Sequence, residues 1–262
     1  MRHILDLERY PIDRPGTPAA KALVARCQAD LAAEGMFNLE GLVRPNVIER
    51  CATQLQPLLD KQSFTHKRRH NVYFLKEVAG LSPDHPALRP VETVNHTLCA
   101  DQIGHTEISK LYEWTPLADF LAAVMKKPAL HLMEDPLASV NVIGYRAGET
   151  LNWHFDRSDF TTTLLIQAPE SGGEFQYRSR LRSDTDPNYD GVARLLRGED
   201  EAVRTLRITP GTLNVFRGTN TLHRVSPPVG NKDRIVAIFS YYDRPGVVFS
   251  TEERLGFYGR AG

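Results

Sequence analysis

The spacing of hydrophobic positions changes near residue 137. Before that point, apolar residues recur every three or four positions in three segments, which is typical of amphipathic helices. These segments are residues 17–35, 46–61 and 115–127. The first has Thr17 as its N-cap, Pro18 at the first helical position and Gly35 beyond its end. A short strand is predicted between the first two helices, and a polar, proline-punctuated stretch, residues 61–103, separates the second helix from the third.

From residue 137 onward, short runs rich in β-branched and aromatic residues follow one another without intervening helices. The runs are ASVNVIGY, LNWHFD, TTTLLIQ, GEFQYRS, RTLRIT, TLNVFRG, LHRVSP and RIVAIFSYY, separated by turn signals such as SGG, TPG and PPVGNKD. Many short strands in succession predict an antiparallel sandwich or jelly roll. One connection, residues 179–204, is long and charged with a helical centre, so we expect an exposed excursion between two strands.

We therefore expect a mainly β protein with additional α-helices. Residues 1–136 are predicted to form a mostly helical region that packs on the core. Residues 137–262 are predicted to form the β core, which carries the charged insertion at about 179–204. The two regions are expected to form one folded unit, because 262 residues suffice for one large domain with a helical extension.

Charge and cysteine content exclude several classes of protein. The 32 basic residues equal the 32 acidic ones, so no net field would attract nucleic acid or an anionic membrane. The N-terminal MRHILDLERYPID carries charges where a signal peptide has its apolar core, and no apolar run is long enough to cross a bilayer. Cys27, Cys51 and Cys99 have no C-x-x-C spacing and fit buried, reduced thiols of a cytoplasmic protein. The sequence leaves a homodimer open.

The stretch LNWHFDRSDF contains His154 and Asp156, one of two His-x-acid pairs in the chain. Nine histidines and 32 acidic residues would give roughly one such pair by chance, so the pair alone means little. The other pair, His105 and Glu107, precedes a helical pattern, where positions i and i+2 do not face each other. His154 and Asp156 lie on a predicted strand, where alternate side chains share a face, so they can form two arms of a metal site.

His223, in the later run LHRVSP, supplies a third arm. Two histidines and one carboxylate that leave coordination positions open are the ligand set of a non-haem Fe(II) facial triad. Zinc accepts the same ligands, so the set does not by itself fix the metal, and a packed or surface histidine is the commoner role. Arg234 opens the apolar run RIVAIFSYY, where an arginine is costly unless it binds an anion. Its planar fork suits a carboxylate, and a solvated arginine at a strand end is the competing interpretation.

Taken together, NVIGYRAGETLNWHFD, GGEFQY, PGTLNVFRGTNTLHRV and RIVAIFSYY resemble the Fe(II)/2-oxoglutarate-dependent oxygenases over roughly residues 137–245. The resemblance implies a double-stranded β-helix, or jelly roll, preceded and flanked by the N-terminal helices. It also implies Fe(II), 2-oxoglutarate as co-substrate, and O2 as the cofactors. The catalytic iron ligands implied by the resemblance are His154, Asp156 and His223.

The same resemblance implies residues for the co-substrate. Arg234 would bind the distal carboxylate of 2-oxoglutarate, although Val236 stands where some oxygenases have the serine of an Arg-x-Ser pair. Tyr145 matches a tyrosine that helps to bind 2-oxoglutarate in the prolyl-hydroxylase-like branch. Asn141, on the same face of that strand, is a weaker candidate.

Within the superfamily, the C-terminal half most resembles the branch of free-amino-acid halogenases and their hydroxylase relatives, through RSDTDPNYDGVARLLRG, PGTLNVFRG and FSTEERLGFYGR. Those halogenases replace the metal-binding aspartate by glycine or alanine, so Asp156 favours oxygenation. In the lysine-specific halogenase the next residue is an acid that contacts the substrate amine, whereas this chain has Arg157, so lysine specificity is not implied.

The resemblance therefore implies hydroxylation of an unactivated C–H bond of a small, amino-acid-like molecule. Trp153, Arg157 and Arg146 are candidates for substrate contacts, and sheet-exterior or solvated positions compete with that role. The basic cluster HKRRH, residues 66–70, either meets an acidic substrate or forms a solvated loop. A cupin-like metal enzyme without 2-oxoglutarate, and a non-catalytic binding module of the same fold, stay open as alternatives.

Overall fold

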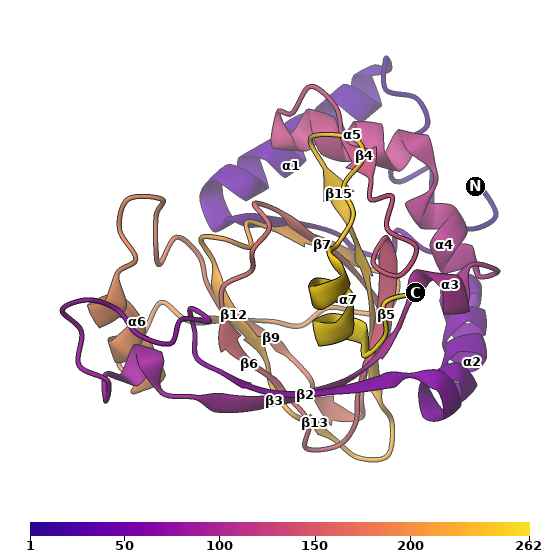
Figure 1. Cartoon of the computed structure of the whole chain (residues 1–262). Coiled ribbons are helices and arrows are strands. Elements are labelled where there is room, and N and C mark those ends of the chain that lie inside the picture. Colours follow the sequence, from indigo (N-terminus) through magenta and orange to yellow (C-terminus); the bar gives the residue numbers. More distant parts are fainter.

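Two antiparallel sheets form the centre of the protein, described here from a computed structural model of residues 1–262 (Figure 1). The larger sheet has the spatial order β1 (Met36–Leu39), β11 (Leu213–Phe216), β7 (Thr161–Gln167), β14 (Arg234–Phe239), β5 (Val140–Tyr145), β3 (Val91–Leu98) and β2 (Phe64–His70). The smaller sheet has the order β10 (Arg204–Leu206), β9 (Phe175–Arg178), β12 (Leu222–Val225) and β6 (Leu151–His154). Two short pairs join β13 (Pro228–Val229) to β8 (Ser171–Gly172) and β15 (Tyr241–Tyr242) to β4 (His131–Leu132).

Each of the eight predicted β runs contains a strand, and every pairing is antiparallel. The two sheets meet through a small aromatic cluster, in which Met36 and Phe216 of the larger sheet pack on Phe175 and Tyr177 of the smaller. Two facing antiparallel sheets with crossing connections are a jelly roll. The predicted mainly β fold with additional helices is therefore confirmed.

The outer face of the larger sheet is apolar because it packs against helices. Alternate strand residues, such as Val140 and Val142 of β5 or Ile235 and Ala237 of β14, belong to one core cluster of 36 buried residues. The opposite side of that core comes chiefly from four helices, which are α1 (Pro18–Glu34), α2 (Pro45–Gln62), α4 (Glu107–Tyr112) and α5 (Thr115–Met125). The residues between the apolar ones point the other way, into the space between the sheets, and this inner face is mixed, with Asn141 and Arg234 beside Ile143 and Val236.

The helix signals read from the sequence mostly hold. Thr17 caps α1 by accepting a hydrogen bond from the Ala20 amide, and Gly35 ends that helix with φ +76°. A side chain at Gly35 would also collide with Ser179, 2.9 Å from its expected Cβ. At α5, however, Thr115 is the first helical residue and the N-cap is Trp114, which makes no side-chain cap.

The predicted division at residue 136 does not divide the sheet. Helices outnumber strands before that point, but β1, β2 and β3 come from this region and take three of the seven places in the larger sheet. Two further short helices lie there, η1 (Pro86–Leu88) and α3 (Ala100–Ile103). The polar stretch 61–103 contains β2 and β3, whose inner side chains are polar, so no apolar alternation marks them.

The insertion 179–204 is less exposed than predicted. Its helix, α6 (Tyr189–Leu196), buries Val192 and Leu195 in a second hydrophobic cluster, together with Phe155, Val72 and Leu222. In Figure 1 this helix lies at one end of the two sheets, near η1. The excursion therefore covers one end of the jelly roll.

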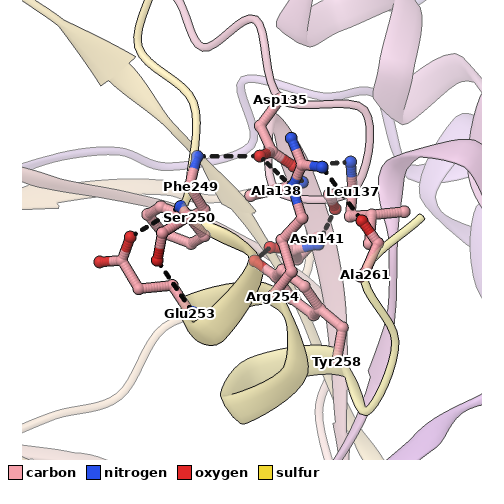
Figure 2. A network of polar contacts seen from close by, with 10 residues as sticks. All are labelled: Asp135, Leu137, Ala138, Asn141, Phe249, Ser250, Glu253, Arg254, Tyr258 and Ala261. Carbon is pink, nitrogen blue, oxygen red and sulfur yellow. Dashed lines mark hydrogen bonds and ion pairs between the residues drawn. The ribbon is translucent and has the colours of Figure 1, made fainter.

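The C-terminal helix, α7 (Thr251–Tyr258), lies against the β2 side of the larger sheet and is held by a buried carboxylate (Figure 2). Asp135 accepts hydrogen bonds from the amides of Leu137, Ala138 and Phe249 and from the Arg254 guanidinium at 2.8 Å. Burial raises the pKa of the Asp135 carboxyl, but these donors outweigh burial and hold that pKa below its usual value. The carboxylate is thus a charged anchor for the C-terminus.

Two sequence expectations about the chain as a whole can be compared with the structure. Cys27, Cys51 and Cys99 are all buried and unpaired, as predicted. None of the helices combines the length and the apolar composition that a membrane span requires.

We expect Asp135→Asn to lower the free energy of unfolding by about 3 kcal/mol at pH 7, because it leaves Arg254 without its buried charge partner. Asp101→Asn is the matched control, since the Arg260–Asp101 pair is solvent-exposed and its loss should cost under about 1 kcal/mol. A depressed carboxyl pKa stabilises the folded state fully above the unfolded pKa of about 4, and this contribution is lost as the pH falls further. The free energies of unfolding of the unmodified chain and of Asp135→Asn, measured by urea titration, should therefore converge in acid. If both variants lost the same free energy of unfolding at pH 7, Asp135 would not anchor the C-terminus.

Candidate metal centre

His154 and His223 face each other across the smaller sheet. His154 is the last residue of β6, His223 lies in β12, and their Cα atoms are direct partners in the antiparallel ladder. Asp156 was predicted on the same strand as His154, but it lies two residues beyond the strand end, in the following loop. The loop nevertheless turns its carboxylate to the two rings, so the structure brings all three predicted residues together.

The three side chains point single ligand atoms at one another. The Asp156 Oδ1 atom lies 3.2 Å from His154 Nε2 and 3.6 Å from His223 Nε2, and the two ring centroids are 4.2 Å apart. One ligand atom from each residue falls within 4.8 Å of the others. Ligand atoms about 3 Å apart suit one ion bound at right angles with bonds of about 2.1 Å. The geometry therefore fits a facial site for a divalent metal.

Backbone carbonyls fix both histidines for metal binding. His154 Nδ1 donates to the Asn152 carbonyl at 2.7 Å, and His223 Nδ1 donates to the Thr221 carbonyl at 3.0 Å. With the proton held on Nδ1, each Nε2 presents a lone pair to the centre. Burial lowers the pKa of His223 to about 4, so its ring is neutral at pH 7 and available as a ligand.

Asp156 is held from both sides of its loop. Its Oδ2 accepts a hydrogen bond of 2.5 Å from the Thr161 hydroxyl, and its amide donates to the Gly218 carbonyl at 3.1 Å. Gly218 leaves no room for a side chain, since a Cβ would lie 2.6 Å from Thr161 Oγ1 and 2.7 Å from Asp156 Cβ. Burial raises the pKa of Asp156, but the two histidines and Thr161 outweigh it and lower that pKa, which keeps the carboxylate ionised.

Arg234 lies on the inner face of the larger sheet, as the first residue of β14. It is buried, its Nε donates to the Gly173 carbonyl at 2.9 Å, and its Nη1 has no partner. Tyr145, its Cα partner on β5, lies with its ring 5.8 Å from the guanidinium carbon and is also buried. A buried guanidinium with an unpartnered N–H is suited to bind an anion between the sheets.

Comparison with known proteins agrees with this arrangement. The family model described as Halogenase D matches residues 19–247.

The chain belongs to the Halogenase D family.

Solved structures with the same fold come from several 2-oxoglutarate-dependent enzymes. The α-ketoglutarate-dependent epimerase SnoN from nogalamycin biosynthesis is 12% identical, with a TM-score of 0.56 over 85% of this chain and 82% of that chain. A prolyl-4-hydroxylase from Pseudomonas putida is 13% identical, with a TM-score of 0.51 over 83% and 98%. HygX from Streptomyces hygroscopicus, with nickel, 2-oxoglutarate and hygromycin B bound, is 12% identical, with a TM-score of 0.54 over 82% and 86%. No curated protein sequence matches the chain.

These likenesses establish the jelly-roll fold of the 2-oxoglutarate oxygenases, and the triad has the ligand set of that class.

Asn141 makes its hydrogen bonds within the protein. Its amide donates to the carbonyls of Leu137 and Leu98, and its Oδ1 accepts a 2.9 Å hydrogen bond from Tyr258 of α7 (Figure 2). These contacts tie Asn141 to the protein itself, and its role at the co-substrate stays a prediction. Sharing a strand face with Tyr145 places it between the sheets, but at the end that α7 closes.

The three suggested substrate contacts lie away from the triad. Arg157 is exposed and pairs with Glu253 of α7 at 3.0 Å. Trp153 lies under the Arg224 guanidinium at 4.9 Å, on the face of β6 that alternation turns away from His154. Arg146 is on an exposed turn. Trp153 and Arg157 adjoin His154 and Asp156 in the chain, but the structure does not turn any of the three side chains to the triad.

Sequence reasoning missed Thr161 and Gly218, which orient Asp156. Neither belongs to a recognisable motif, because Thr161 reads as an ordinary strand residue and Gly218 as a turn glycine. The basic cluster 66–70 is not a loop, as the commoner interpretation had it, but forms most of β2. That strand turns Arg68 toward the site.

We expect Thr161→Val to weaken Fe(II) binding by about 10- to 100-fold, because it removes the hydrogen bond that orients Asp156 while preserving shape. Thr163→Val, two residues along the same strand, is the control and should bind metal as the unmodified chain does. Anaerobic titration with Fe(II) measures both, and an unchanged affinity in Thr161→Val would show that the hydroxyl does not position the ligand.

Proposed function

We propose that the chain is an Fe(II)/2-oxoglutarate-dependent oxygenase that hydroxylates an unactivated C–H bond of a small, amino-acid-like molecule. His154, Asp156 and His223 would hold the iron. The observation that carries this proposal is the convergence of two Nε2 atoms and one carboxylate oxygen in a fold that also buries the Arg234 guanidinium with its Nη1 unpartnered. A cluster of side chains that served only to stabilise the fold would not need a buried guanidinium with an unpartnered nitrogen.

When bound, iron with 2-oxoglutarate and O2 supplies the oxidant, and overall one oxygen atom enters the substrate while succinate and CO2 leave. The protein's own residues would bind the iron and the co-substrate, orient the ligand side chains and exclude water from the site. The carbonyls of Asn152 and Thr221 hold both imidazoles in one tautomer, and Thr161 holds the carboxylate. A facial metal site requires its three ligand side chains to be held in fixed orientations in this way.

Arg234 would bind the distal carboxylate of the co-substrate. Its Nε is already committed to Gly173, so the Nη groups are the ones free to bind an anion. Gly173 has φ +62°, and a Cβ there would approach Arg234 Cδ to 3.1 Å, so this glycine lets the guanidinium lie close to the turn. Tyr145 adds a buried hydroxyl from the neighbouring strand.

Asp156 favours hydroxylation over halogenation. In the halogenases that the sequence resembles, loss of this carboxylate opens a coordination position for the halide. Here the carboxylate is present, turned to the histidines and fixed by Thr161. The amino-acid-like substrate rests on the Halogenase D match and on the resemblance to the free-amino-acid branch.

The first test is anaerobic addition of Fe(II) and 2-oxoglutarate to the metal-free protein, followed in visible light. We expect a metal-to-ligand charge-transfer band, and succinate formation once air and a substrate are admitted. His154→Ala should abolish both, because one ligand of three is lost. Metal binding without the band would favour a cupin-like enzyme that does not use 2-oxoglutarate, and absence of bound metal would favour a binding module.

The second test concerns the co-substrate. We expect Arg234→Gln to raise the 2-oxoglutarate concentration for half-maximal band intensity by about 100-fold, since a charge-assisted bidentate contact is lost. Arg146→Gln is the control, because Arg146 follows Tyr145 directly but is exposed. Equal 2-oxoglutarate affinity in the two variants would remove Arg234 from the co-substrate site.

A further inference from the structure

A solvent-open groove beside the insertion is lined by three arginines. Arg180 and Arg182 come from the start of the insertion, and Arg217 comes from the turn between β11 and β12. The groove has a volume of about 530 Å³, and the end of α1 forms another part of its wall. None of the three candidate metal ligands lines it, so this groove is separate from the metal centre.

The three arginines of the groove are not neutralised by ion pairs. Two arginines on neighbouring strands are paired, Arg178 with Asp200 and Arg204 with Glu34, whereas those of the groove form no ion pair. Their only side-chain hydrogen bond is the one that the Arg182 Nε donates to a backbone carbonyl. One carboxylate, that of Asp186, lines the groove, so three guanidiniums against one carboxylate leave an excess of about two positive charges.

The segment that carries Arg180 and Arg182 is held in a fixed shape. Arg180 has φ +55°, in the left-handed region that a long side chain rarely adopts. The Asn188 side chain donates to the Leu181 carbonyl at 2.6 Å, and the Asn220 side chain donates to the Arg182 carbonyl at 3.2 Å. Backbone conformations that the surrounding structure enforces in this way occur at ligand clamps. A ligand of the groove would therefore not have to order this segment.

Two of these arginines also contact the loop that carries Asp156, one at each end. The Arg182 guanidinium carbon lies 4.0 Å from the centroid of the Phe155 ring, and Phe155 directly precedes Asp156. The Arg217 guanidinium carbon lies 5.1 Å from the centroid of the Phe160 ring, at the end of the loop just before β7. The groove and the ligand loop therefore share two cation–π contacts.

Arg182 has a further connection to the same loop. Its Nε donates to the Thr219 carbonyl, and Thr219 follows Gly218, whose own carbonyl accepts a hydrogen bond from the Asp156 amide. An anion held between Arg182 and Arg217 would thus fix both ends of the ligand loop and the turn that contacts its middle. Outer contacts that orient a metal ligand change metal affinity by about 10- to 100-fold.

Charge and size together indicate the kind of ligand. Guanidinium groups bind phosphate through two parallel hydrogen bonds, and a phosphate ester carries a charge of about −1.5 to −2 at pH 7. The excess positive charge of the groove matches that value. Its volume falls in the range of small-molecule sites, so there is room for an organic group attached to the phosphate.

We propose that the groove lined by Arg180, Arg182 and Arg217 is a second ligand site, which binds a small phosphate ester and, when occupied, tightens the loop that holds Asp156. The ester would act as a positive effector of metal binding, and each ligand would raise the affinity for the other by the same factor. This inference goes beyond the proposed function, because it does not depend on the reaction at the metal centre.

The first measurement is calorimetric titration of the metal-free protein with ribose 5-phosphate and with inorganic phosphate, at constant ionic strength. We expect saturable binding of one ester per chain, with the ester bound more tightly than inorganic phosphate. Arg180→Gln and Arg217→Gln should each lower the affinity for the ester by about 10-fold or more, since each removes charge-assisted hydrogen bonds. Both side chains are exposed, so the fold should be unaffected. Arg244→Gln is the control, because Arg244 is exposed and does not line the groove.

The second measurement is anaerobic Fe(II) titration with and without saturating ribose 5-phosphate. We expect the ester to raise the Fe(II) affinity of the unmodified protein by about 10-fold. Arg180→Gln should bind Fe(II) as the unmodified protein does when no ester is present, because Arg180 does not contact the ligand loop. The same ester concentration should raise its affinity much less. Chelation of Fe(II) by the ester would lower the apparent affinity of both proteins equally, so the comparison between them isolates the effect of the groove.

Four results would overturn the proposal. The unmodified protein could show no saturable binding of either probe, or Arg217→Gln could bind the ester as tightly as Arg244→Gln, which would place the ligand elsewhere. Tighter binding of inorganic phosphate than of the ester would exclude an ester as the ligand. An ester that binds without changing the Fe(II) affinity would exclude the connection to Asp156. Failure of the proposed function looks different, because the titration of metal-free protein would still show the anion site.

Discussion

The register between β6 and β12 is the constraint on which the candidate metal centre depends. It sets the Cα atoms of His154 and His223 opposite each other, so both rings leave the smaller sheet on the same side with centroids 4.2 Å apart. A slip of one residue would turn one ring to the opposite face, because strand side chains alternate. The ladder cannot place the third ligand, since β6 ends at His154. Asp156 depends instead on the turn at Gly218, whose carbonyl accepts a hydrogen bond from the Asp156 amide. This close approach is possible only because Gly218 has no side chain.

The residues on either side of Asp156 are tied to the two segments that close the ends of the jelly roll. Phe155 packs into the cluster built around α6, with the Arg182 guanidinium 4.0 Å from its ring. Arg157 pairs with Glu253 of α7, the helix that Asp135 anchors from the far side (Figure 2). The insertion and the C-terminus are therefore part of what fixes the ligand loop, besides covering the space between the sheets (Figure 1). A jelly roll without them would carry the same three ligands on a looser support.

The sequence predicted best those parts where packing imposes a pattern. The four runs that join the larger sheet, in β5, β7, β11 and β14, have an apolar outer face, so their alternation is visible, and the order of His154, Asp156, His223 and Arg234 is distinctive. β2 and β3 were not predicted because their inner side chains are mostly polar. β2 is also an edge strand, so it carries charged residues on both faces.

A strand face specifies the direction of a side chain but not its position along the space between the sheets. Asn141 and Tyr145 point into the same space, yet Asn141 lies where Tyr258 of α7 fills it, and only Tyr145 lies next to Arg234. Thr161 and Gly218 could not be found locally either. Their importance comes from contacts with Asp156 that only the folded chain creates.

The space between the sheets is also unusual in its charge. Lys67 and Arg69 on the outer face of β2 are solvated, whereas Arg68 and Arg234 face inward and each keeps a buried nitrogen without a partner. An unpaired buried cation lowers the stability of the folded chain, and replacement by an apolar residue of similar size would relieve that penalty. The cost is offset only in complexes with anions, and a ligand that binds the folded state stabilises it in proportion to its occupancy. The two arginines thus make the ligand-free protein less stable than its fold allows, which is the expected signature of side chains kept for binding.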